Sequence, residues 1–166
     1  MLKYLKFIVV LIAIMASVPV FAQQEKYADM EAEVFEYVND HRAKVGLKPL
    51  VRNDTVCEAA MEHCQYMGNK SVSINHDNFE ERMHALMKTV KPCYGAAENV
   101  ARGQKDAREV VDMWLSSPGH KDNIEGDYNM SGVSIYKGGD GRLYFTQIFL
   151  KRKYPAQKVA KAQPEG

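Results

Sequence analysis

Apolar residues recur at intervals of three or four positions through the first half of the chain, which is the period of one face of an α-helix. Over residues 27–45 this spacing runs through Met30, Val34 and Val38, and Gly46 ends the run. The pattern predicts a first helix with one buried face.

A second helical pattern follows a capping pair. Asn53 and Asp54 favour the start of a helix that continues to about Gly68. The spacing of apolar residues further predicts a short helix near residues 80–87 and another over residues 106–115.

Strand-like patterns close the chain. Residues 130–136 and 143–150 are rich in β-branched and aromatic side chains, and they flank the segment K-G-G-D-G-R, which is typical of a hairpin turn. The helices precede these strands without β-α-β alternation, which indicates the α+β class. We therefore expect helices first and an antiparallel hairpin last.

The N-terminus has the plan of a secretory signal. Lys3 and Lys6 precede an apolar run at residues 7–18, and the small-x-small sequence V-F-A ends at Ala22. This plan predicts a signal peptide over residues 1–22, cleaved after Ala22. The run is too short for a membrane span, and no cysteine follows it for lipid attachment. We expect a secreted or periplasmic protein with no stable membrane span after cleavage.

Length and charge suit one domain. The 144 residues after the predicted signal fit a single domain at residues 23–150 with a basic, flexible C-terminal tail at residues 151–166. Without the two lysines of the signal, the 22 basic residues fall to 20, against 21 acidic ones. This near-neutral balance gives no indication of nucleic acid as a partner.

Three cysteines enter an oxidising compartment if the signal is used, so a disulfide is expected. Cys57 and Cys64 lie seven residues apart on one predicted helix, about 10 Å along its axis, which is beyond disulfide reach. An intramolecular bridge must therefore use Cys93, paired with either helical cysteine.

Two histidines occur in turn-like sequences. His76 lies in N-H-D-N-F and His120 in W-L-S-S-P-G-H-K-D-N-I, and each is 22 residues from Glu98 in A-A-E-N-V-A. Side chains in such loop-like segments can project into a cleft rather than pack under a helix. By contrast, the other histidines fall on predicted helices, where a surface or core-edge position is expected: His41, His63 and His84.

Together with N-D-H-R-A-K-V-G-L-K-P-L at residues 39–50, the helix at 54–67 and Y-F-T-Q-I-F at 144–149, these motifs resemble the bacterial branch of the CAP superfamily, also called SCP-like domains. That superfamily includes cysteine-rich secretory proteins, antigen 5 and pathogenesis-related proteins. The resemblance covers roughly residues 30–150. It implies a three-layer α-β-α sandwich with a central antiparallel sheet.

The resemblance also implies a binding cleft that gathers the three motif residues. Its members would be His76, Glu98 and His120, with Asn99, Ser116 and Gln147 as further polar groups in the cleft or at its edge. Phe79 and Trp114 are expected in the core, and Arg82 is expected to pair with an acid near the cleft.

Two departures from the family pattern bear on function. Tyr144 stands where many eukaryotic relatives have histidine, and Ser117 stands where they have a second glutamate. Binding of a lipid, peptide or cell-envelope polymer is therefore favoured over catalysis. The alternative is a metal-assisted hydrolase or protease acting through His76, Glu98 and His120. No cofactor is required, but His76 and His120 are candidate ligands for a divalent cation such as zinc.

Overall fold

The computed structural model describes residues 26–70 and 74–153. The predicted signal peptide, its cleavage site and most of the basic tail lie outside the described residues. A helix over residues 26–44 comes first. It is followed by β1 (Val51–Arg52), α2 (Asp54–Lys70), α3 (Phe79–Thr89), β2 (Cys93–Arg102), α4 (Ala107–Ser116), α5 (Pro118–Glu125), β3 (Met130–Lys137) and β4 (Leu143–Arg152).

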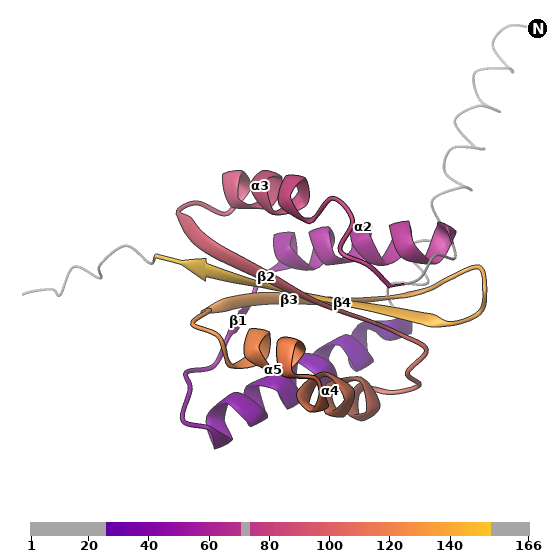
Figure 1. Cartoon of the computed structure of the whole chain (residues 1–166), viewed down its shortest axis with the longest axis horizontal. Coiled ribbons are helices and arrows are strands. Elements are labelled where there is room, and N and C mark those ends of the chain that lie inside the picture. The colour runs from indigo at the N-terminus through magenta and orange to yellow at the C-terminus, as the bar shows by residue number, and fades with distance from the viewer. Residues whose placement is uncertain (1–25, 71–73, 154–166) are drawn as a thin grey trace, which may run out of the picture.

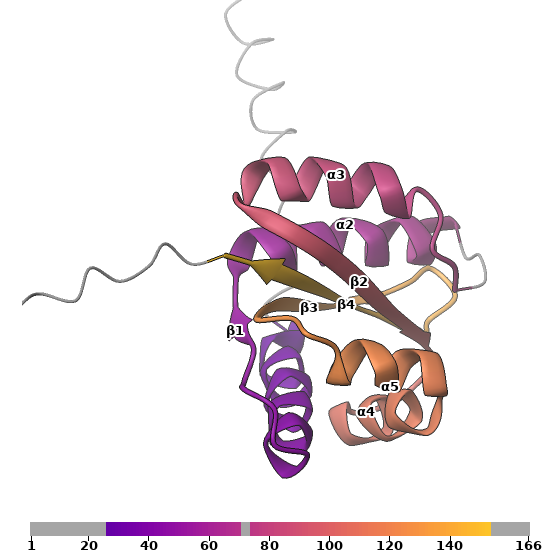
Figure 2. The ribbon, with the colours of Figure 1, turned by 60° about the vertical axis from the view of Figure 1, so that its left-hand side comes forward.

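The described elements form three layers of the α+β class. The sheet has the strand order β1-β3-β4-β2. Helices α2 and α3 cover one face, and the helix over residues 26–44 covers the other together with α4 and α5 (Figures 1 and 2). The predicted hairpin is confirmed, because β3 and β4 pair antiparallel. The sheet is mixed rather than wholly antiparallel, since the short β1 runs parallel to β3.

The predicted cap of the second helix forms, and α4 has a cap that was not predicted. The Asn53 Oδ1 atom accepts a hydrogen bond from the amide of Val56 at 3.2 Å, at the start of α2. At the start of α4, Asp106 accepts one from the amide of Glu109 at 2.8 Å. Each side-chain oxygen satisfies an amide that has no partner inside its own helix.

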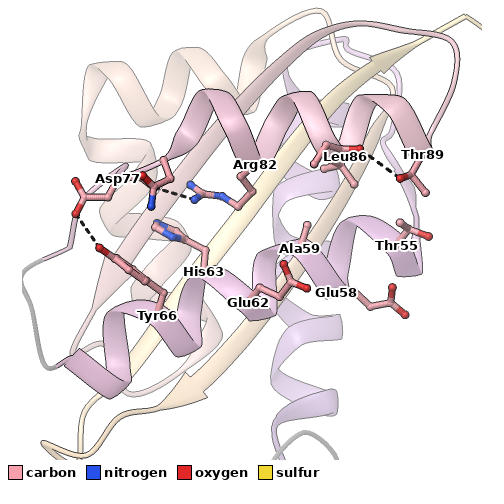
Figure 3. A pocket seen from close by; sticks show the side chains of 12 residues that line it. Thr55, Glu58, Ala59, Glu62, His63, Tyr66, Asp77, Arg82, Leu86 and Thr89 are labelled. Carbon is pink, nitrogen blue, oxygen red and sulfur yellow. Dashed lines mark hydrogen bonds between the residues drawn. The ribbon is translucent and has the colours of Figure 1, made fainter.

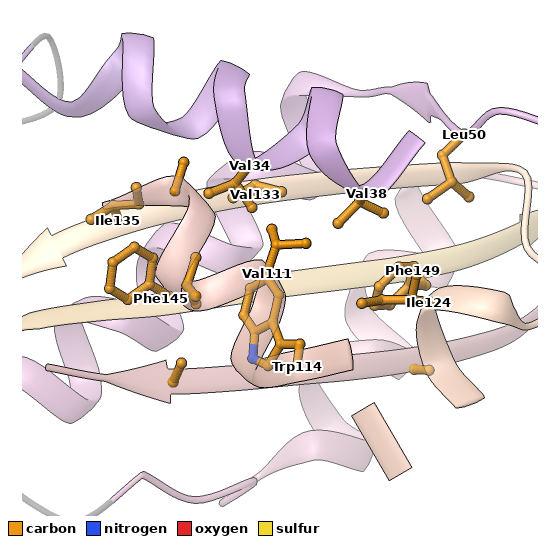
Figure 4. Close-up of a cluster of buried hydrophobic side chains, with 14 of the residues drawn as sticks. Val34, Val38, Leu50, Val111, Trp114, Ile124, Val133, Ile135, Phe145 and Phe149 are labelled. Carbon is orange, nitrogen blue, oxygen red and sulfur yellow. The ribbon is translucent and has the colours of Figure 1, made fainter. Parts of the chain in front are cut away.

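Hydrophobic side chains fill both spaces between the layers. Successive strand residues point to opposite faces, so Phe149 packs in the larger core with Trp114 and Val38 (Figure 4). Its neighbour Ile148 packs in a second core against α2 and α3. Trp114 is fully buried, so its predicted role as a core anchor is confirmed.

The motif A-A-E-N-V-A is part of a strand, which the sequence did not predict. It lies in β2, a strand of ten residues that pairs antiparallel with β4 at the edge of the sheet. Helices therefore do not all precede strands. Because β2 is covered on both faces, it lacks the polar and apolar alternation of a half-exposed strand. His120 likewise lies on a helix, α5, with Pro118 at its first turn.

The prediction of a disulfide from Cys93 is wrong, because all three cysteines are free in this structure. Cys57 lies over β3, because a Cβ added to Gly132 would come within 2.4 Å of the Cys57 amide nitrogen. Cys93 is on β2, and β4 lies between these two strands. Two strand spacings amount to about 10 Å, too far for a disulfide.

The second helical cysteine is no closer to a bridge. The Cys64 thiol donates to Thr146 Oγ1 and to the carbonyl of Ser134, both at 3.2 Å. Thr146 is opposite Val100 on β2, seven residues along the strand from Cys93 and hence about 23 Å away. Separately, none of the described helices is long and apolar enough to cross a membrane.

Candidate functional site

The Glu98 carboxylate is the centre of the candidate site. Glu98 lies in the middle of β2, and its side chain is 0% exposed. Arg82 of α3 contacts both carboxylate oxygens through Nη2, at 2.8 and 2.9 Å, and donates from Nε at 3.2 Å. The predicted pairing of Arg82 with an acid is confirmed. A buried carboxylate needs such charge-assisted bonds, because burial removes its hydration.

His76 makes the second contact with this carboxylate. Its Nδ1 atom lies 2.9 Å from Glu98 Oε1. An ionised carboxylate only accepts hydrogen bonds, so Nδ1 must carry a proton. In the neutral ring the lone pair is therefore on Nε2, and the side chain is 51% exposed. Glu98 fixes the tautomer of His76 and leaves one ring nitrogen able to accept a proton or bind a cation.

His63 is a third partner, which sequence reasoning missed. It was expected at the surface or core edge, but its side chain is 1% exposed. Its Nε2 lies 2.9 Å from the carbonyl oxygen of Asn75 and 3.6 Å from Glu98 Oε1. His63 follows Ala60 by three residues and precedes Met67 by four, which puts all three on one helix face. That spacing is the sequence feature that could have indicated a buried His63.

Burial and charge oppose each other at His63. Burial lowers the pKa of His63, and the Glu98 carboxylate and the Asn75 carbonyl counter part of that effect. The loop that carries His76 is held by α2 at a second point besides the contact of His63 with Asn75. Tyr66 of α2 stacks on His63, and the Tyr66 hydroxyl donates to Asp77 Oδ2 at 3.3 Å. Helix α2 thus positions the backbone on both sides of His76.

A hollow of about 380 Å³ lies between α2 and α3 on one side of this cluster. Figure 3 shows His63 and Glu62 on α2 facing Arg82 and Leu86 on α3. Arg82 also donates from Nη1 to the carbonyl of Asp77 at 2.9 Å. The hollow is therefore walled by the groups that hold Glu98, while Glu98 itself does not line it.

A second hollow, the β2 groove, has a volume of about 340 Å³. It is lined by His76, Phe79, Ala96, Ala97, Glu98, Asn123 and Tyr128. Phe79 is half-buried in this wall and also packs against the second core. The β2 groove is thus the space into which the half-exposed His76 opens.

His120 lies near His76 without contacting Glu98 through any hydrogen bond among the described residues. Burial lowers the pKa of His120, and the charge of nearby His76 lowers it further. His120 Nδ1 is buried and has no hydrogen-bond partner among residues 26–70 and 74–153. The structure therefore brings His76 and Glu98 into contact and places His120 within electrostatic reach of His76.

Asn99 joins β2 to α5. Its Nδ2 donates to the carbonyl of His120 at 3.0 Å, and its Oδ1 accepts from Asn123 Nδ2 at 2.9 Å. The same Asn123 amide lies 3.2 Å from the carbonyl oxygen of Glu98. Asn99 is fully buried, so it positions His120 and does not open to a ligand.

The remaining two predicted cleft residues do not join this cluster. Ser116 is exposed and its hydroxyl donates to the carbonyl of Met113, at 2.7 Å. Gln147 is buried and donates from Nε2 to Ser131 Oγ at 3.1 Å. Both side chains hydrogen-bond within the fold rather than with His76 or Glu98.

The arrangement offers at most two imidazole nitrogens to a metal. Catalytic zinc sites generally have three protein ligands, and the described residues contain no group of three or more His, Cys, Asp or Glu side chains suited to hold an ion. Glu98 is already engaged by Arg82. A preformed three-ligand site is thus not available in the described part of the chain, and zinc binding stays a prediction.

Comparisons with known proteins agree with the fold and the motifs. The family described as "CAP: Cysteine-rich secretory protein family" matches residues 35–149. "Uncharacterized protein YkwD" of Bacillus subtilis (strain 168) is 34% identical over 122 residues, which are 72% of this chain and 46% of that protein. The chain thus spans less than half the length of the curated relatives it matches.

Solved structures are similar in fold. An outer surface protein from Borrelia burgdorferi has a TM-score of 0.67 and 26% identity, covering 76% of this chain and 96% of that one. An extracellular protein containing an SCP domain from Bacillus anthracis has a TM-score of 0.66 and 21% identity, covering 75% of this chain and 41% of that one.

Proposed function

We propose, from the premise that this chain belongs to the CAP family of cysteine-rich secretory proteins, that it is an extracellular binding module whose β2 groove recognises a polar group of its ligand. The observation that carries the proposal is the hydrogen bond of 2.9 Å between His76 Nδ1 and Glu98. It leaves Nε2 as the acceptor on a half-exposed ring at the groove wall.

The surroundings favour recognition over catalysis. Arg82 neutralises the Glu98 carboxylate with three close contacts, so this carboxylate is not free to take a proton from water. Phe79 and Tyr128 line the groove beside Asn123 and His76. Such a lining suits a ligand with an apolar body and a polar group, which a lipid, a peptide and a cell-envelope polymer all offer.

The second candidate is a metal-assisted hydrolase, and one observation favours it. His120 Nδ1 is buried without a partner among the described residues and lies near His76. His76 and His120 would hold a zinc ion, which when bound would supply Lewis acidity and a more acidic water. Glu98 would then orient His76 from behind.

Export is part of the proposal. The similar proteins from Borrelia burgdorferi and Bacillus anthracis are described as an outer surface and an extracellular protein. We propose secretion or periplasmic export after cleavage behind Ala22. Mass spectrometry of the protein recovered from the native compartment should give an N-terminus at Gln23. A retained Met1 would contradict cleavage.

The binding site can be tested on the histidine itself. Long-range ¹H–¹⁵N spectra of the imidazoles, recorded while fatty-acid micelles, glycan fragments or linear peptides are added, should show His76 Nε2 shifting for one ligand class. His76→Ala should abolish that binding. His84→Ala, an exposed histidine on α3, is the matched control and should leave it unchanged. Equal binding by both variants would contradict the assignment.

Metal content separates the two candidates. Elemental analysis of protein purified without chelator, followed by screening for peptide and ester hydrolysis, should find less than one zinc per chain and no turnover that His76→Ala removes. Stoichiometric zinc with turnover that is lost in His76→Ala would favour the hydrolase.

A further inference from the structure

Strand β2 exposes one side of its backbone. It is the last strand in the order β1-β3-β4-β2, so only β4 pairs with it. Side chains on the open side reach two of its carbonyls: Asn123 donates to Glu98 and Trp114 Nε1 donates to Val100, at 3.2 and 3.3 Å. Main-chain groups alternate in direction along an antiparallel strand. The even-numbered residues of β2 therefore point their N–H and C=O groups away from the sheet.

Three consecutive outward groups of β2 stay open. The N–H and C=O of Ala96 and the N–H of Glu98 have no hydrogen-bond partner within the described part of the chain. The bulge between Cys93 and Gly95 ends the regular edge on one side, and the Asn123 amide caps it on the other. The open edge is thus a short donor, acceptor and donor series with strand spacing.

The β2 groove lies over this same edge. Ala96, Ala97 and Glu98 line it together with His76 and Tyr128. Natural proteins usually cover or interrupt a strand edge, because its unpaired groups can pair with another chain. Here the edge on both sides of the groove is interrupted or capped, while the part inside it is open.

We propose that the ligand is a peptide segment in extended conformation, which pairs with Ala96 and Glu98 as a fifth strand beside His76. This proposal rests on the proposed function. One peptide residue exchanges two hydrogen bonds with Ala96. The carbonyl two residues away accepts from the Glu98 amide. A lipid chain would displace water from those amides without replacing its hydrogen bonds, which is costly. Peptide backbone is therefore favoured.

The first test uses variants of the peptide. A linear nonapeptide is selected from a displayed library for binding to the protein that spans residues 23–166. Each backbone amide of the synthetic peptide is N-methylated in turn, and the dissociation constant is measured by calorimetry. Methylation of the amide that donates to Ala96 should weaken binding about tenfold, the effect of one lost hydrogen bond. Methylation of its two neighbours should have little effect, because their amides point away. Equal effects at all positions, or no selected peptide, would overturn the proposal.

The protein side uses Ala96→Pro. This change removes an outward N–H that β4 does not use, and proline is tolerated where a strand amide faces outward. It should weaken the nonapeptide about tenfold, the effect of one lost hydrogen bond, whereas Ala96→Gly, which keeps the amide, should bind like the wild type. Loss of binding in His76→Ala without any response to N-methylation or Ala96→Pro would refute strand pairing and leave the proposed function standing. Binding that ignores His76→Ala as well would refute both.

Discussion

Two buried carboxylates near opposite edges of the sheet have very different partners. Glu31, on the helix over residues 26–44, is 5% exposed and accepts a hydrogen bond from the amide of Ile135 at 2.8 Å. Glu98, on β2, is 4% exposed and contacts Arg82, His76 and His63. Burial raises the pKa of Glu31 to about 7 despite that amide and the more distant Arg52.

Glu31 is a structural carboxyl, whereas Glu98 belongs to the candidate site. Glu31 accepts the outward amide of Ile135 on β3, past the short β1, and a protonated carboxyl can still accept that hydrogen bond. Glu98 contacts a guanidinium and two imidazoles, and its hydrogen bond with Nδ1 sets the tautomer of His76. A buried acidic residue therefore indicates a functional site only when its partners are cationic or imidazole groups that also reach the surface.

The largest effect should come from removing the cation beside Glu98. Arg82→Met leaves that carboxylate buried without its guanidinium, which should cost about 3 to 5 kcal/mol in the free energy of unfolding. Urea denaturation at pH 7.5 measures this. The double variant Arg82→Met with Glu98→Gln removes the charge as well and should recover a large part of the loss. A double variant less stable than Arg82→Met alone would contradict this account of Glu98.

Glu31 should show its protonation in the pH dependence of stability. Its folded pKa of about 7 lies above the ordinary value of 4.5, so the folded state holds the proton more tightly than the unfolded state. The contribution is complete below pH 4.5 and is lost as pH rises through 7. It amounts to about 3 kcal/mol for a shift of this size.

The control for that dependence is Glu31→Gln, which keeps an acceptor for the Ile135 amide and cannot titrate. Urea titrations from about pH 5 to about pH 8.5 should show the wild type losing stability with rising pH relative to this variant. The lowered pKa values of buried His63 and half-buried His120 act in the opposite direction, because those rings favour the folded state above their unfolded pKa. Parallel curves for the two proteins would show that Glu31 keeps an ordinary pKa.

Much of the fold followed from local patterns. The hairpin of β3 and β4, the capped start of α2 and the apolar stripe of α4 all depend on residues close in sequence, and each was predicted. Strand β2 was missed because both of its faces are buried by segments distant in sequence. The mistaken disulfide has the same origin, since the distance from Cys93 to α2 depends on which strand α2 covers.

The candidate site was likewise predicted only in part. The motifs identified His76 and Glu98, which the structure places in contact, and the expected acid partner of Arg82 is Glu98 itself. Ser116 and Gln147 were carried over from family positions, and their hydrogen bonds lie elsewhere. His63 was missed because a lone histidine on a helix is seldom functional. Its importance depends on Asn75 and Glu98 arriving from two other segments, which helix spacing alone does not reveal.

The smallest effect is expected at His63, the more distant of the two imidazoles that contact Glu98. His63→Phe keeps the ring volume but removes the donor to the Asn75 carbonyl, which should cost about 1 to 3 kcal/mol of stability, as for a buried acceptor left without a partner. His63→Gln can still donate and should recover part of the loss. The imidazole ¹⁵N signals of His76 test whether His63 also positions His76. In His63→Phe these signals should move toward those of a ring that exchanges between tautomers. In His63→Gln they should return toward the wild-type values. Unchanged His76 signals in His63→Phe would mean that Glu98 alone fixes His76, and that His63 only fills space beneath the loop.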